Sequence, residues 1–174
     1  SLSWYGMSNT EREEVLSKAC AAKEVAPVVA QLSTPRKNEI LQRAAENLIA
    51  HTEDILAANK QDIDAGRERG MSESLIDRLS LDAARVEGIA GGLRQVAGLQ
   101  DPVGEILQGR TMDNGIQMKQ VRVPLGVMGM VYEARPNVTV DAFGLAIKSG
   151  NVPLLRGSKS ARNSNAKSVS YTHL

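Results

Sequence analysis

Residues 122–159 hold the pattern that most constrains the fold, because a strand, a helix and a second strand follow one another there. Segment 125–132 is a compact apolar run typical of a buried strand, 138–149 has the apolar periodicity of a helix that ends at Gly150, and 152–155 is apolar again. A β-α-β unit of this kind requires parallel strands joined by a right-handed crossover. Both polar turns that follow the strands then lie at the carboxyl edge of the sheet, where open α/β sheets bind ligands.

The residues before this unit are predicted to be helical, in segments at 10–30, from 34 onward, 52–70, 73–78 and 83–97. Thr10 and Glu13 have the spacing of a capping box. Pro27 is expected to kink or end the first helix, because proline lacks the backbone donor. Thr34 followed by Pro35 is a favourable helix start, and Thr52 is expected to cap the third helix.

A β-hairpin is predicted between the helices and the β-α-β unit. Segments 103–111 and 116–123 look extended, and Asp113-Asn114-Gly115 joins them. Asn-Gly favours a type I′ turn, in which both residues have positive φ. In the last strand, Pro153 is an awkward residue for an interior position, since it cannot donate to a ladder.

The composition is that of an ordinary globular chain, with 42% hydrophobic and 24% charged residues. Aromatic residues make up only 3%, so any core must consist of aliphatic side chains and methionine. A net charge of +1 gives no indication of nucleic acid or membrane binding, and no apolar run is long enough to span a bilayer. Cys20 is the only cysteine, which excludes an intrachain disulfide and suits a cytoplasmic location, and no Cys/His spacing predicts a metal site.

The carboxyl half contains four notable strings: VPLGV at 123–127, EARPNVTVD at 133–141, KSGN at 148–151 and LLRG at 154–157. Together they resemble the gamma-glutamyl phosphate reductases, a branch of the aldehyde dehydrogenase superfamily that acts in proline biosynthesis. Shorter matches are NKQD at 59–62, DRL at 77–79 and DPVG at 101–104. The GxGxxG fingerprint is missing, which counts against a standard Rossmann dehydrogenase.

The resemblance implies an α/β, aldehyde-dehydrogenase-like fold, truncated after the first β-α-β unit of a Rossmann-like cofactor domain. We expect 7–168 to be the amino-terminal portion of that NADP-binding domain, with a helical part at about 9–98, a hairpin at about 103–123 and the β-α-β unit at about 125–157. Residues 1–6 and 169–174 are expected to be non-native extensions, and the final segment resembles a reading frame of a DNA-sequencing adapter.

The implied reaction of the intact protein is the NADPH-dependent reduction of L-glutamyl 5-phosphate to glutamate 5-semialdehyde and phosphate, through a thioester on a cysteine. That cysteine lies beyond the end of this chain in the family, so the fragment is expected to be inactive and to expose an aggregation-prone sheet edge. Cys20, beside the apolar stripe of the first helix, is expected to be structural.

Asn137 matches the superfamily asparagine that donates its amide to the oxyanion. A cap for the following helix is the alternative role. Glu133, Ala134 and Pro136 would line the nicotinamide side of the cofactor, mainly through their backbone. Arg135 would bind the phosphate or carboxylate of the substrate, with a structural ion pair as the alternative.

Arg156, Gly157, Ser158 and Lys159 match the turn that holds the adenosine ribose and its 2′-phosphate. Gly157 would allow close approach of the backbone to the ligand, and the two cations favour NADPH over NADH. The alternative is a solvated basic face, because no acidic residue follows Asp141.

The family resemblance further implies a homo-oligomer and an association with glutamate 5-kinase. Two other functions remain open: another aldehyde or acyl dehydrogenase of the superfamily, and a non-catalytic nucleotide-binding or helical interaction fragment.

Overall fold

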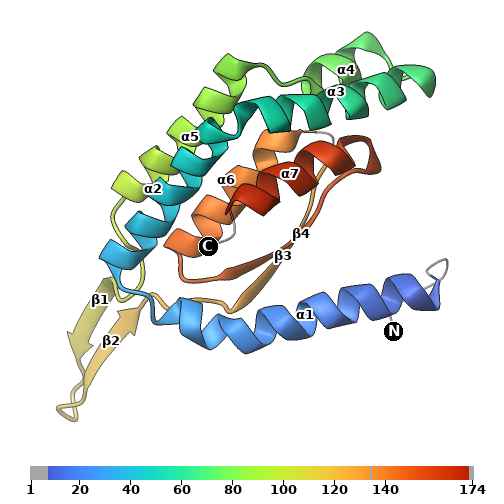
Figure 1. Cartoon of the computed structure of the whole chain (residues 1–174). Coiled ribbons are helices and arrows are strands. Elements are labelled where there is room, and N and C mark those ends of the chain that lie inside the picture. The colour runs from blue at the N-terminus through green and yellow to red at the C-terminus, as the bar shows by residue number, and fades with distance from the viewer. Residues whose placement is uncertain (1–7, 134, 173–174) are drawn as a thin grey trace.

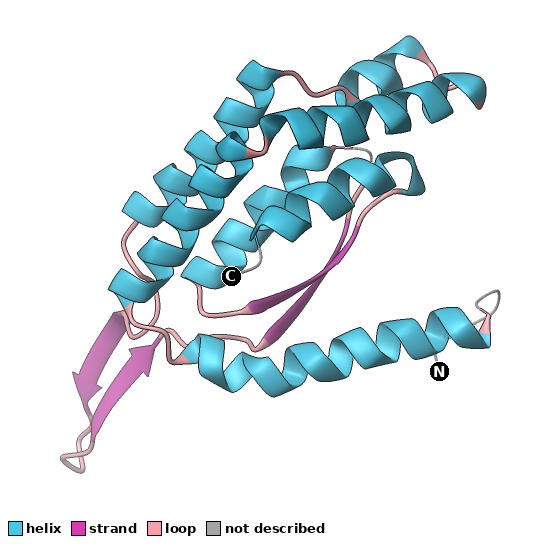
Figure 2. Cartoon of the chain, viewed as in Figure 1, coloured by secondary structure: helices cyan, strands magenta, loops and turns pink. Residues whose placement is uncertain are grey.

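The amino-terminal half of the chain is helical, as its periodicity predicts. The computed structural model describes residues 8–133 and 135–172. Its first five helices are α1 (Asn9–Ala30), α2 (Thr34–Ala50), α3 (Thr52–Glu68), α4 (Glu73–Leu79) and α5 (Ala83–Gly98). Helices α2, α3 and α5 form an outer layer, whereas α1 lies on the far side of the strands (Figures 1 and 2).

The carboxyl half contains the predicted hairpin and the predicted β-α-β unit. Its elements are β1 (Ile106–Thr111), β2 (Gln117–Val121), β3 (Val127–Val131), α6 (Pro136–Lys148), β4 (Val152–Arg156), the 3-10 turn η1 (Lys159–Ala161) and α7 (Arg162–Thr172). Strands β3 and β4 are parallel, with Val127 opposite Val152. Helix α6 packs on β4, α1 contacts both strands, and α7 lies beside α6, α2 and α3 (Figure 1). These elements confirm the predicted α/β fold class.

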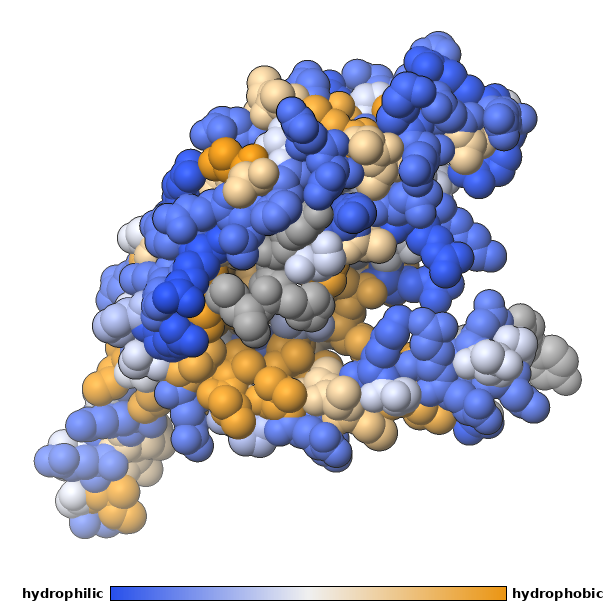
Figure 3. Space-filling view, viewed as in Figure 1, coloured by the Kyte–Doolittle hydropathy of each residue, from blue (hydrophilic) through white to orange (hydrophobic). Residues whose placement is uncertain are grey.

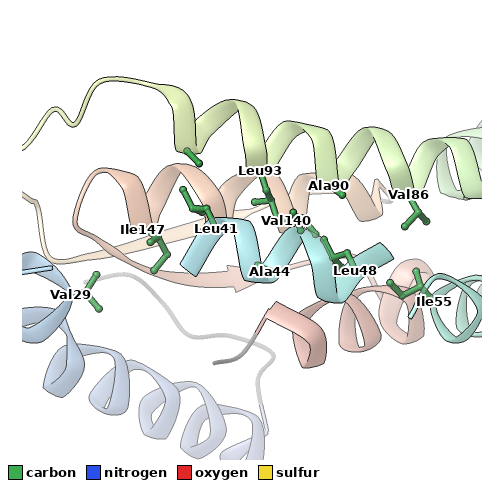
Figure 4. Packing of buried hydrophobic residues seen from close by; sticks show 12 residues of the cluster. Val29, Leu41, Ala44, Leu48, Ile55, Val86, Ala90, Leu93, Val140 and Ile147 are labelled. Atoms are coloured by element: carbon green, nitrogen blue, oxygen red, sulfur yellow. The ribbon is translucent and has the colours of Figure 1, made fainter. Parts of the chain in front are cut away.

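An aliphatic core joins α2, α5 and α6 (Figure 4). Leu41, Leu48 and Leu93 are almost completely buried in it, and the twelve residues of this cluster include no aromatic side chain. Gly144 lets α6 approach α5, because a Cβ there would lie 2.8 Å from Leu93 Cδ2. Among the helices of the described residues, none combines the length and the apolar character that crossing a membrane requires.

The starts and ends of the helices correct three expectations. Helix α1 has its capping box at Ser8 and Glu11 rather than at Thr10 and Glu13, because the helix begins at Asn9. Of the two outcomes expected at Pro27, an early end is wrong, because α1 continues to Ala30 and buries Ala26 and Val29 on either side of the proline, whereas a kink stays a prediction. Tertiary burial of this stripe offsets the missing hydrogen bond.

Thr52 does not cap α3 either. Its hydroxyl donates backward to the carbonyls of Leu48 and Ile49. His51 takes the cap position of α3, but its ring nitrogen hydrogen bonds to the Asn47 carbonyl of α2, so no side chain caps α3. The hydroxyl therefore satisfies the carboxyl end of α2 instead of the amino end of α3. The predicted start of α2 at Thr34 is confirmed, with Ser33 as its cap.

The hairpin turn differs from the predicted type I′. Gly115 has φ of +85°, but no non-glycine residue described has positive φ, so Asn114 does not adopt the required conformation. The Gly115 N–H donates to Met112 O and the Met112 N–H donates to Ile116 O, at 2.8 Å each. This is a three-residue connection closed by a left-handed glycine, which needs positive φ at one position only. The Asn114 side chain accepts from the Ile116 N–H instead.

The β1–β2 hairpin projects from the body and every residue of both strands is exposed (Figures 1 and 3). Ile106, Ile116 and Met118 contribute to its apolar surface.

Pro153 is accommodated within β4 because of the register. The Val152 N–H donates to Gly126 O just before β3, and the Arg156 carbonyl accepts from the Tyr132 N–H. Since alternate residues of a strand face the same neighbour, the nitrogen of Pro153 faces away from β3. The proline thus removes no hydrogen bond from the β3–β4 ladder.

Two buried lysines fix the carboxyl end of α6. Lys37 Nζ lies 3.0 Å from both carboxylate oxygens of Asp101 and donates to the Lys148 carbonyl. Lys148 Nζ donates to Asn38 Oδ1 and to the Ala97 carbonyl. Burial of Asp101 opposes its ionisation, yet hydrogen bonds from Thr34, the Val103 N–H and Lys37 lower the pKa of Asp101. The network therefore locks α6 against α2 and α5.

Asn59 and Asp62, in the NKQD string, position two further segments. Asn59 donates to the Leu79 carbonyl and accepts from the Leu81 N–H, which fixes the α4–α5 connection. Asp62 accepts from the N–H groups of Asn163 and Ser164 at 3.1 and 2.7 Å. An α3 carboxylate thus caps the start of α7.

The sequence analysis did not predict α7. The expected non-native origin of 169–174 stays a prediction, and positions 1–7, 173 and 174 lie outside the described residues.

Candidate functional site

The two polar turns lie side by side at the carboxyl edge of β3 and β4, as expected for parallel strands. The backbone hydrogen bond between Tyr132 N and Arg156 O, 3.1 Å long, joins the points where the two turns begin. The turn after β3 leads into α6, and the turn after β4 leads through η1 into α7. Asn151 supports this unit from the other end, because its side-chain oxygen accepts the N–H groups of Leu125 and Gly126.

A hollow of about 400 Å³ lies at the start of α6. One wall comes from α6 and the residue before it, with Arg135, Pro136, Asn137 and Asp141. The opposite wall comes from α4, α5 and their connection, which Asn59 holds; its residues are Asp77, Arg78, Ser80, Leu81, Arg85, Gly88 and Ile89. A smaller hollow of about 70 Å³ adjoins it, with Glu133, Arg135 and Arg78 among its lining residues.

Asn137 lies in the first turn of α6 and lines the larger hollow. Arg135, not Asn137, occupies the cap position of α6, and no side-chain hydrogen bond caps this helix. The alternative role of Asn137 as a helix cap is therefore wrong. Among the described residues the Asn137 amide has no hydrogen-bond partner, so it is available to a ligand beside the positive end of a helix.

The three arginines of the hollow are not equivalent. Arg85 donates to the carbonyls of Asp77 and Ser80 and to the Asp77 carboxylate, so it holds the α4–α5 connection. The side chains of Arg78 and Arg135 have no ion pair or hydrogen bond within the described part of the chain, and both line the two hollows. The structural ion pair considered for Arg135 is thus not formed with any described residue.

Asp141 follows Asn137 by one helical turn and lines the same hollow. Its carboxylate lies against α5, where a Cβ on Gly92 would be 3.5 Å from Oδ1. Partial burial raises the pKa of Asp141, and no described residue donates a hydrogen bond to it. Because Asp141 is also exposed to solvent, this shift carries only a small cost in folding stability.

A partly buried chain of polar side chains links the turn after β3 to α6 and α7. The Tyr132 hydroxyl hydrogen bonds to Thr139 Oγ1, which donates to Asn165 Oδ1 at 2.9 Å. Burial raises the pKa of Tyr132, although the Thr139 hydrogen bond opposes this. A Cβ on Gly157 would overlap the Asn165 amide and lie 3.3 Å from the Tyr132 ring. Internal packing is therefore one reason for a glycine at 157.

The turn after β4 carries two cations, Arg156 and Lys159, outside both hollows. The Ser158 side chain accepts from the Ser160 N–H and caps η1. Hydrogen bonds from Ser8 lower the pKa of Glu11, and the charges of Lys159 and Arg156 add to this effect. The start of α1 therefore lies near this turn, an arrangement that the sequence analysis did not foresee.

The remaining candidates lie elsewhere. Ala134 falls outside the described residues. Cys20 is exposed on α1 and does not line either hollow. In the described part of the chain, no group of three or more His, Cys, Asp or Glu residues could hold a metal ion.

Sequence reasoning missed Arg78, Asp141 and the wall formed by α4 and α5. Both residues belong to strings that were noticed, DRL at 77–79 and EARPNVTVD at 133–141. The signal was present, but only the fold shows that the two strings meet at one hollow.

Solved structures of known proteins resemble this chain closely, although no family model matches it. The gamma-glutamyl phosphate reductase of Thermotoga maritima is 43% identical, with a TM-score of 0.88 over 91% of this chain and 38% of that protein. The Saccharomyces cerevisiae enzyme of the same name is 30% identical, with a TM-score of 0.86 over 95% of this chain and 41% of its own. A probable aldehyde dehydrogenase from Listeria monocytogenes, 15% identical with a TM-score of 0.68 over 92% of this chain and 32% of its own, shares the fold.

The chain spans about two fifths of the length of the two reductases. The identities hold over nearly all of this chain, and they agree with the strings in both of its halves. Over the length that it spans, the chain belongs to the gamma-glutamyl phosphate reductase family, with the fold of the aldehyde dehydrogenases.

Proposed function

We propose that the intact protein containing this chain reduces L-glutamyl 5-phosphate to L-glutamate 5-semialdehyde and phosphate with NADPH, in the cytoplasm, as a homo-oligomer that associates with glutamate 5-kinase. The observation that carries the reaction is the Asn137 amide in the first turn of α6, which has no partner among the described residues and lies on the wall of a hollow that also holds Arg135. The proposal is supported by the sequence identity to the two gamma-glutamyl phosphate reductases.

Asn137 would donate its amide to the carbonyl oxygen of the substrate as negative charge develops there. A positioned donor of this kind contributes about 3 kcal/mol to lowering the barrier. Because the phosphate leaves from the same carbon, Arg135, two residues before Asn137, is suited to bind it. The nucleophilic cysteine would come from the part of the protein that this chain does not span; Cys20 lies exposed on α1, away from the hollow.

The residues of the second turn fit the adenosine end of NADP. Arg156 and Lys159 are cations without an ion pair among the described residues, and Ser158 adds a hydroxyl. Such a set suits a ribose 2′-phosphate. Glu133 and Pro136, with Ala134, would line the nicotinamide side. The bound cofactor supplies the hydride; these residues bind and orient it.

The test is the reverse reaction of the complete reductase. We expect NADP reduction by glutamate 5-semialdehyde to depend on phosphate, and Asn137→Ala to lower kcat by about 10²- to 10³-fold. Phosphate-independent oxidation of simple aldehydes at comparable kcat/KM would instead identify another aldehyde dehydrogenase of the same fold. A preference for NAD over NADP would contradict the proposed role of Arg156 and Lys159.

A further inference from the structure

The larger hollow contains groups of opposite charge that have no described partner. Arg78 lies on the α4 wall and Asp141 on the α6 wall. Both line a space of about 400 Å³, yet no ion pair joins them. Neither has a hydrogen-bond partner among the described residues, and partial burial disfavours the Asp141 charge. Opposite charges that are held apart across a hollow are complementary to a dipolar ligand.

Neighbouring residues do not neutralise these two charges. Arg85 is committed to Asp77 and Ser80, so it does not pair with Asp141. Arg94 pairs with Glu87, and Lys148 is buried at the other end of α6. Leu81 and Ile89 add an apolar lining to the wall formed by α4, α5 and their connection. Besides Arg135 next to Asn137, the hollow thus offers an anion on the α6 wall and, on the other wall, a cation beside a short apolar surface.

We propose that Arg78 and Asp141 are specificity-determining residues that bind the α-amino acid head of the substrate: Asp141 accepts hydrogen bonds from the α-ammonium group, and Arg78 donates to the α-carboxylate. This inference rests on the proposed function. The reacting carbonyl is at Asn137, and the head group lies three carbon atoms further along the substrate. Arg135, two residues before Asn137, is then left for the phosphate, while Arg78 on the opposite wall reaches the distant carboxylate.

The test pairs each residue with the substrate group that it binds. Using the complete reductase in the reverse direction, kcat/KM is measured for glutamate 5-semialdehyde, for 5-oxopentanoate, which lacks the amino group, and for 4-aminobutanal, which lacks the carboxylate. We expect Asp141→Asn to lose about 10- to 100-fold on the semialdehyde and little on 5-oxopentanoate. Arg78→Gln should lose as much on the semialdehyde and little on 4-aminobutanal.

Matched controls are Glu46→Gln and Arg67→Gln, which alter exposed charges on α2 and α3 away from the hollow. Both should behave as the wild type with all three aldehydes. Arg78→Lys, which keeps the charge but not the planar fork, should recover part of the activity that Arg78→Gln removes.

Three outcomes would overturn the inference. Equal losses on all three aldehydes would show a structural role for these residues. A higher KM for phosphate in Arg78→Gln, with unchanged discrimination among the aldehydes, would move Arg78 to the phosphate. Wild-type activity in both variants would remove them from the site. If the wild-type protein itself fails to oxidise the semialdehyde, the proposed function fails instead, so the two failures are distinguishable.

Discussion

The two ends of α6 treat their polar groups in opposite ways. At the carboxyl end, Lys148 makes two hydrogen bonds and its carbonyl accepts a third from Lys37. At the amino end, Asn137 and Arg135 have no partner in the described part of the chain. Polar groups that are buried with partners hold helices in place, whereas those without partners beside a hollow are available to ligands. The same helix thus joins an anchored end to the end that lines the candidate site.

The largest effect is expected at the anchored end. Lys37→Ala removes a fully buried cation and leaves Asp101 with only the Thr34 and Val103 hydrogen bonds. Breaking a buried pair in this way costs about 3–5 kcal/mol in the free energy of unfolding. Urea denaturation of the complete protein measures it, with the exposed Lys60→Ala as the control. A loss equal to that of the control would show that the buried network does not anchor α6.

Asn137→Ala tests the other end. The barrier to reaction should rise by about 3 kcal/mol while the midpoint of thermal unfolding stays within about 1 °C of the wild type, because the side chain has no described partner to give up. Steady-state kinetics and calorimetry on the same preparation measure both quantities. A large fall in thermal stability with unchanged kcat would reverse the comparison.

The elements that meet at the two ends of α6 could be predicted from the sequence, but the hydrogen-bond partners of the polar residues could not. The strands, the helix between them and the stop at Gly150 followed from periodicity and turn chemistry. Lys37 and Lys148 look like surface residues in a linear pattern, and only the packing of α2, α5 and α6 against one another buries them. The partners of Asp62 lie more than a hundred positions away at Asn163 and Ser164, a distance at which local rules carry no information.

The failures at helix caps and at the hairpin have a local cause. A capping box at Thr10 and one at Ser8 differ by two residues, and the hydroxyl of the residue that immediately precedes the first helical residue takes the role. For the hairpin, Asn-Gly is compatible with two turn types, and the one observed needs positive φ only at Gly115.

Gly157→Ala, in the turn after β4, should have a moderate effect on the free energy of unfolding. The added methyl group would overlap the Asn165 amide and press on the Tyr132 ring, which costs about 1–3 kcal/mol in the free energy of unfolding. If the glycine also admits the cofactor, the Kd for NADPH should rise more than this loss of stability alone explains. Adding Gly157→Ala to an Asn165→Ala background separates the two effects. There the overlap with the amide is gone, so the further loss of stability should be smaller than in the wild-type background, whereas the loss of affinity for NADPH should be as large if the methyl group blocks the cofactor.

The smallest effect is expected from Asp141→Asn on stability, and it depends on pH. The folded state raises the pKa of Asp141, so it holds the proton more tightly than the unfolded state. Stability then falls as pH rises from the unfolded value through the raised folded value. The variant should therefore unfold at a slightly higher temperature than the wild type near neutral pH. The difference should vanish at acid pH, where both states of the wild type are protonated.

Pro153 has a consequence for how the strands assemble with other chains. Because its nitrogen faces the free edge of β4, a strand that docks there finds no N–H at that position, and the docked ladder lacks one rung. A missing rung lowers the gain from pairing with an identical edge on a neighbouring molecule. Pro153 thus costs the ladder between β3 and β4 nothing, yet it weakens self-association at the other edge of β4.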